Sequence, residues 1–179
     1  MTESAYGELA PVMEAYGAGC YAAQSLESSL RLLLVLSRLA RAGEQISAEA
    51  FEHVESETSW ISLMQLFKKA KKKAYFSNHD YRTVKSAIVA RNLLIHKYWR
   101  RNVTKTLTPE GRALAVDDID QLKRQIIAAD QLILALVDRY LKEYGISTEA
   151  LQQKAEEMYD AGSESHSDPG RLPDELGDD

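Results

Sequence analysis

The stretch AIVARNLLIHKYWRRN, Ala87 to Asn102, sets polar residues into a strongly apolar helical segment. On a helical wheel of about 100° per residue, Arg91 lies in the stripe that should face the core. Asn92 and His96 are four residues apart, so they share a second stripe. A helix that is apolar on most sides usually has neighbours on most sides. We therefore expect this helix to be packed within a bundle, with Arg91, Asn92 and His96 turned towards a cleft or a subunit interface. The stripe that contains Arg91 also holds Val84, Ile88, Ile95 and Tyr98.

A partly buried guanidinium needs partners, because burying an unpaired charge lowers the stability of the fold by roughly several kcal/mol. The structural alternative is that Arg91 pairs with an acid of the last long helix, Asp118 or Asp130, and that His96 is a hydrogen-bonded interface histidine. A two-fold axis beside the Asn92 and His96 stripe would instead bring two copies of these residues together. Symmetric dimers are the commonest oligomers, so we expect a homodimer.

Helical periodicity extends along most of the chain, whereas strand-like alternation is almost absent. We expect main helices over residues 16–42, from Thr58 through the following lysines, over 81–101 and over 114–144, with Gly145 ending the last. Short helices are expected to begin at Ser47 and Ser147. This pattern predicts an all-α protein: an antiparallel four-helix bundle with short extra helices.

Charge and composition suggest how the chain is organised. Residues 160–179 hold seven acids and one base among Gly, Ser and Pro, so we expect a disordered acidic tail after a single helical-bundle domain over residues 1–159. Residues 68–101 hold eleven Lys or Arg and one acid. Such a basic concentration is either a binding surface for a polyanion or simply a solvated helix face.

Several classes of protein are disfavoured. The first ten residues have no basic segment and no apolar run, and no stretch is long enough to span a bilayer, so we expect no secretory signal, no membrane partner and a cytoplasmic location. The single cysteine, Cys20, cannot form an intramolecular disulfide. We find neither metal-ligand spacing nor a glycine-rich phosphate loop, and predict no metal and no cofactor. A helix-turn-helix DNA binder is also disfavoured, because the basic third helix is too apolar to lie exposed in a groove.

The segment RNLLIHKY, Arg91 to Tyr98, resembles the R-x4-H-x-Y signature of the HEPN superfamily, in the form seen in HepT-type toxins. The order of helices over about residues 16–144 is also similar. The resemblance implies a helical bundle, often a homodimer, and in many members a metal-independent ribonuclease of toxin–antitoxin or defence systems. Members without nuclease activity exist, so a non-catalytic module that binds a protein or a nucleotide-containing partner is the alternative.

The resemblance also implies roles for individual residues. Catalysis would lie with Arg91, Asn92 and His96: the histidine as general acid or base, the arginine stabilising charge on the phosphate, and the asparagine orienting either of them. Tyr98 would line the cleft and correspond to the tyrosine that a partner nucleotidyltransferase antitoxin modifies with AMP in HepT-type toxins. Trp99 would stack on a base or simply pack. The RNA backbone would be held by Lys68, Lys72, Lys97, Arg100 and Arg101.

Overall fold

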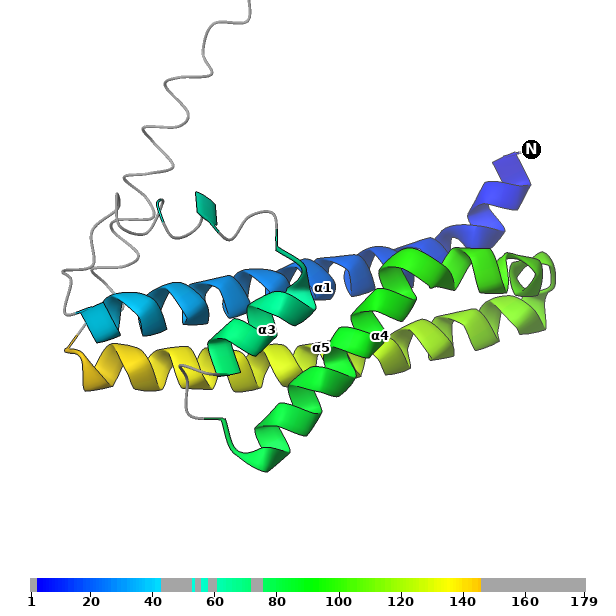
Figure 1. The fold of residues 1–179 in the computed structure, drawn as a ribbon. Helices are drawn as coiled ribbons and strands as arrows, with labels where there is room; N and C mark the ends of the chain where they lie inside the picture. The colour runs from blue at the N-terminus through cyan, green and yellow to red at the C-terminus, as the bar shows by residue number, and fades with distance from the viewer. Residues whose placement is uncertain (1–2, 43–52, 54–55, 58–60, 72–75, 146–179) are drawn as a thin grey trace, which may run out of the picture. The chain divides into compact units, whose positions relative to one another are not determined.

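The computed structural model describes residues 3–42, 53, 56–57, 61–71 and 76–145, and the regular structure within these ranges is entirely helical (Figure 1). The all-α prediction is therefore confirmed for the described part of the chain. The short helices expected to begin at Ser47 and Ser147, and the tail from residue 160, lie outside the described residues.

Helix α1 (Glu3–Ala42) is the longest element and supplies a large part of the core. Several of its leucines, among them Leu26 and Leu30, are fully buried. The helix begins at Glu3 rather than near Tyr16, although Pro11 lies within it. Contacts outside the helix support this early part, because Val12 is fully buried and Glu8 forms an ion pair of 2.6 Å with Arg112.

Helix α3 (Leu63–Lys71) is shorter than the helix expected from Thr58, because its first turn begins at a cap that the apolar pattern does not reveal. Ser62 Oγ accepts from the backbone N–H of Gln65 at 3.4 Å, and Gln65 Oε1 accepts from the backbone N–H of Ser62 at 3.1 Å. This reciprocal pair is a capping box. Residues 58–60 lie outside the described part of the chain, and Ile61 precedes the cap.

Helix α4 (Asn78–Asn102) carries the motif, and it begins three residues before the expected start at residue 81. Ser77 and Asp80 form a second capping box, with bonds of 3.1 and 2.9 Å. The buried face of α4 contains Val84, Ile88 and Tyr98, as the wheel predicts. Ile95 is only partly buried whereas Leu94 is fully buried, so the buried face of α4 is rotated towards Leu94 relative to the predicted stripe.

Residues 102–113, which separate the helices expected over 81–101 and 114–144, are themselves almost entirely helical. A 3₁₀ helix, η1 (Val103–Leu107), leads directly into α5 (Pro109–Glu143). Thr108 caps α5 by accepting from Gly111 N at 3.1 Å, and proline at the first helical position loses no intrahelical bond. Gly111 has to be glycine, because a Cβ atom would lie 1.8 Å from the Lys105 carbonyl oxygen. Helix α5 therefore begins five residues before Leu114, at the Thr108 cap.

The direction of the helices differs from the predicted antiparallel arrangement. Helices α1 and α5 run parallel, because Glu8 pairs with Arg112 near both starts and Ser25 donates to Asp130 at 2.7 Å further along both. Helix α4 runs against both of them (Figure 1). The short-loop antiparallel prediction is thus wrong for α1 and α5.

The chain divides into two units, residues 1–140 and 141–179. In the second unit only residues 141–145 are described, and they contain the end of α5. Gly145 adopts a left-handed φ of 65° and donates its N–H to the Lys142 carbonyl at 3.3 Å. This confirms that Gly145 ends the helix. The predicted boundary between residues 1–159 and the tail lies outside the described residues and stays a prediction.

Candidate functional site

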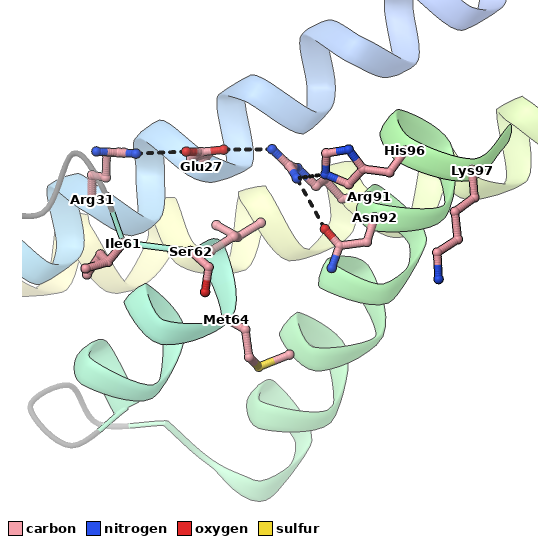
Figure 2. Close-up of a pocket in the computed structure, with 10 residues that line it drawn as sticks. Glu27, Arg31, Ile61, Ser62, Met64, Arg91, Asn92, His96 and Lys97 are labelled. Atoms are coloured by element: carbon pink, nitrogen blue, oxygen red, sulfur yellow. Dashed lines mark hydrogen bonds and ion pairs between the residues drawn. The ribbon is translucent and has the colours of Figure 1, made fainter. Parts of the chain in front are cut away.

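The three motif residues that were expected to act together do meet, and Arg91 is the residue that joins them (Figure 2). Arg91 Nη1 donates to Asn92 Oδ1 at 3.2 Å and lies 3.0 Å from His96 Nε2. All three side chains come from α4, where helical geometry places Asn92 and His96 on one face. The predicted cluster of Arg91, Asn92 and His96 is therefore present as a connected group.

The acid that pairs with Arg91 is Glu27 of α1, whose Oε2 lies 3.0 Å from Arg91 Nη2. Arg91 pairs with neither of the acids expected from the sequence. Asp118 forms an ion pair of 3.1 Å with Lys105, and Asp130 accepts from Ser25. The expectation of an Arg91 partner on α5 is thus wrong, because the register between α1 and α4 brings Glu27 to this point.

Glu27 is shared between two arginines. Its Oε1 accepts from Arg31 Nη2 at 2.8 Å, one turn further along α1, while Oε2 holds Arg91. The side chains of Arg91 and Glu27 are 19% and 26% exposed, so the pair is largely but not completely removed from water. Arg91 Nε is buried and has no hydrogen-bond partner. The guanidinium is therefore held through its two Nη atoms and keeps an unsatisfied donor.

The hydrogen bond to His96 constrains the imidazole. A guanidinium carries donors and no acceptor, so the 3.0 Å contact is a hydrogen bond only if His96 Nε2 offers a lone pair. The neutral ring then carries its proton on Nδ1. His96 is itself solvent-exposed, which leaves the ring accessible to a ligand.

These side chains line a pocket of about 450 Å³ between α1, the start of α3 and α4. Three cations and one carboxylate line it, a formal charge of +2 when His96 is neutral. Opposite the charged row, Ile61 and Met64 give an apolar wall. Pockets of this size commonly hold small ligands or single groups of larger ones. Its lining comprises Glu27, Arg31, Ile61, Ser62, Leu63, Met64, Arg91, Asn92, His96 and Lys97.

The aromatic residues of the motif lie away from this pocket. Tyr98 does not line it as expected: the side chain is 2% exposed, and its hydroxyl donates to the Ala115 carbonyl of α5 at 2.9 Å. Burial, with a smaller contribution from the Asp118 carboxylate, raises the pKa of Tyr98 to about 12. Trp99 packs edge-on against Tyr16 with ring centroids 5.2 Å apart, which favours its packing role over base stacking.

The other predicted phosphate-binding residues are only partly brought to the site. Lys97 lines the pocket, whereas Lys68, Arg100 and Arg101 are exposed on α3 and α4 outside it. Lys72 lies outside the described residues. Glu27 and Arg31 were missed from the sequence, although a charged pair four residues apart within SLESSLRLLLVL was a signal for a polar site on α1.

The described residues were also compared with what a metal site and a membrane-spanning helix require. The described residues contain no group of three or more His, Cys, Asp or Glu side chains that could share a metal ion. Among the described helices, none combines the length and the hydrophobicity that crossing a bilayer requires.

No protein-family model, no curated protein and no solved structure matches the chain. The resemblance to the HEPN superfamily therefore rests on the Arg91–Tyr98 motif and on the order of the helices.

Proposed function

We propose that the protein is a HEPN-type, metal-independent endoribonuclease of the cytoplasm, acting as a toxin or defence component. The observation that carries the proposal is that Arg91, Asn92 and His96 form one hydrogen-bonded cluster in a positively charged pocket. Histidine moves protons near neutral pH, and arginine binds phosphate through several donors, so the cluster has the groups that RNA cleavage by a neighbouring hydroxyl needs.

In the proposed reaction, His96 accepts the proton of an RNA 2′-hydroxyl. The 2′-oxygen attacks the adjacent phosphorus, and the bond from phosphorus to the 5′-oxygen breaks as that oxygen takes up a proton. The products are a 2′,3′-cyclic phosphate and a 5′-hydroxyl end. Arg91 stabilises the charge that develops on the phosphate oxygens, and Asn92 keeps the guanidinium in place.

The need for two proton-transfer groups supports a homodimer. Cleavage requires a group that accepts the 2′ proton and a group that donates one to the leaving oxygen. Among the described lining residues, histidine is the only type that ordinarily titrates between pH 5 and 8, and there is one, His96. Because His96 is exposed at the pocket, a second copy of the chain can supply the other imidazole.

The alternative is a non-catalytic HEPN-type module that binds a protein or a nucleotide-containing partner. One observation favours it: Nε2 of His96 is already occupied by Arg91, and Arg91 by Glu27, so the described state has no free base. A nucleotidyltransferase antitoxin remains a candidate partner in either case. The modification of Tyr98 is not part of our proposal, because that hydroxyl is buried and bonded to Ala115.

The test is RNA cleavage in EDTA by the wild-type protein and by His96→Ala and Arg91→Met. Two exposed residues of the same helix give matched controls, His79→Ala and Arg82→Met. We expect both site variants to lose at least about 100-fold in rate, His96→Ala because a proton-transfer group is lost and Arg91→Met because stabilisation of the phosphate charge is lost, while both controls keep wild-type activity. Equal losses in site and control variants, or no cleavage by a clean wild-type preparation, would refute the enzyme and favour the binding module.

A further inference from the structure

Glu27 connects the candidate site to a second helix, and its contacts are specific to individual atoms. Each of its carboxylate oxygens holds the Nη2 atom of a different arginine, Arg31 at 2.8 Å and Arg91 at 3.0 Å. Because Nη2 of Arg91 is held from α1, Nη1 is left to face α4, where it meets Asn92 and His96. Arg91 is thus held by Glu27 through Nη2, and its Nη1 points to the imidazole of His96 (Figure 2).

We infer that Glu27 is a positioning residue which, through Arg91, fixes the tautomer of His96. The guanidinium can only donate, so it selects the neutral ring that has its lone pair on Nε2 and its proton on Nδ1. Free neutral imidazole side chains prefer the opposite tautomer, with the proton on Nε2. The site therefore imposes the less common form, and it does so only while Arg91 is held in place.

Glu27 is suited to this role because it is shared. Arg31 keeps the carboxylate in place from within α1, since the two residues are one helical turn apart. Asn92 supports Arg91 Nη1 from within α4 at 3.2 Å. The guanidinium is consequently held by one residue on each of two helices, Glu27 and Asn92, in addition to its contact with His96. Loss of the Glu27 charge leaves only the contacts from α4.

This arrangement has a consequence for catalysis that rests on the proposed function. A phosphate that enters the pocket is an anionic acceptor, and charge-assisted bonds are stronger than a bond to a neutral imidazole. The Nη1 hydrogen bond then passes from His96 Nε2 to a phosphate oxygen, while Glu27 still holds Nη2. Nε2 is left with a free lone pair beside the phosphate, so substrate binding itself exposes the base.

The tautomer can be measured without any RNA. We suggest ¹⁵N-histidine labelling and long-range ¹H–¹⁵N spectra at a pH well above the ordinary imidazole range. The chain has four histidines, and the His96 signals are assigned by their loss in His96→Gln. The variants are Glu27→Gln and Arg91→Met, and the matched control is Glu14→Gln, an exposed carboxylate of the same helix.

We expect the Nδ1–H form of His96 to predominate in the wild type and in Glu14→Gln, and the Nε2–H form to predominate in Glu27→Gln and Arg91→Met. A wild-type Nε2–H form would overturn the inference. So would an unchanged Nδ1–H form in Glu27→Gln when helical circular dichroism is retained, since His96 would then be fixed without Glu27.

Kinetics give the second readout. If Glu27 acts by positioning, Glu27→Gln should lower kcat by roughly 10- to 100-fold, which is less than the ~10²–10⁴-fold effect of losing a proton-transfer group. KM should change by less than about threefold, and Glu27→Asp should recover part of kcat because it restores the charge. An effect confined to KM would contradict positioning. Absence of cleavage by the wild type would refute the proposed function alone, because the tautomer measurement does not depend on activity.

Discussion

Replacing Arg91 with methionine should leave the stability of the protein nearly unchanged while it removes the proposed RNA cleavage. The side chain lies in the stripe of α4 that includes buried Val84 and Ile88, and it is only 19% exposed. A methionine matches the aliphatic stem of the arginine and adapts its shape to such a site. Glu27 would keep Arg31 as a partner after the change.

The expected change in the free energy of unfolding is the balance of two contributions, the lost ion pair with Glu27 and the removal of an unpaired buried N–H. Losing the pair with Glu27 costs about 1–2 kcal/mol, because both partners retain some exposure and the attraction is screened. Removing the buried Nε–H, which has no acceptor, relieves a penalty of about 1–3 kcal/mol. The expected net change in the free energy of unfolding is within about 1 kcal/mol of zero.

Replacing the acidic partner of Arg91 instead should destabilise the protein. Glu27→Met leaves the largely buried guanidinium of Arg91 without its acid, and we expect a loss of about 1–3 kcal/mol in the free energy of unfolding after allowance for partial exposure. Urea unfolding at neutral pH, at one fixed protein concentration, measures both variants. A loss of more than about 2 kcal/mol in Arg91→Met, or no loss in Glu27→Met, would contradict this account of the cluster.

Three other predictions concern the fold and the binding surface. Gly111→Ala should lower the free energy of unfolding by about 3 kcal/mol, because its Cβ would meet the Lys105 carbonyl oxygen; thermal unfolding measures this, and an unchanged Tm would contradict it. Tyr98 has a folded-state pKa of about 12, whereas an unfolded tyrosine titrates near 10, so the folded state holds this proton more tightly. Tyr98 therefore contributes stability that is complete below about pH 10 and is lost as pH rises through about 12, and unfolding across this window should show a shallower decline in Tyr98→Phe. Lys97→Ala should reduce the slope of log K for single-stranded RNA against log salt by about 0.7, as loss of one phosphate contact does, and an unchanged slope would place Lys97 outside the interface.

The sequence predicts the helices well where local signals and apolar periodicity agree. Gly145 ends α5 as expected, whereas α4 begins after the Ser77 cap, three residues before the expected start. The predicted starts of α3 and α5 were wrong. The two helices begin at the Ser62 and Thr108 caps, and the apolar periodicity gives no sign of a helix start at either residue. Local periodicity also cannot give the direction of one helix relative to another, so the parallel arrangement of α1 and α5 was missed.

The candidate site shows the same division between local and long-range information. Arg91, Asn92 and His96 belong to one helix, so their spacing alone predicts that Asn92 and His96 share a face. Glu27 lies 64 residues before Arg91, and only the packing of α1 against α4 makes it the partner. From the sequence we could expect that a buried arginine pairs with an acid, but we could not predict which acid it is.

The identity of that acid helps to separate a structural role from a functional one. A cluster that served stability alone would match its charges and leave no buried donor unpaired. Here Lys97 faces the pocket that Glu27 and Arg91 line, and Arg91 Nε is a buried donor without an acceptor. An anion that enters the pocket would meet the charge of Lys97 and accept hydrogen bonds from the guanidinium of Arg91. A phosphate is such an anion, so these two features support the proposed binding of RNA.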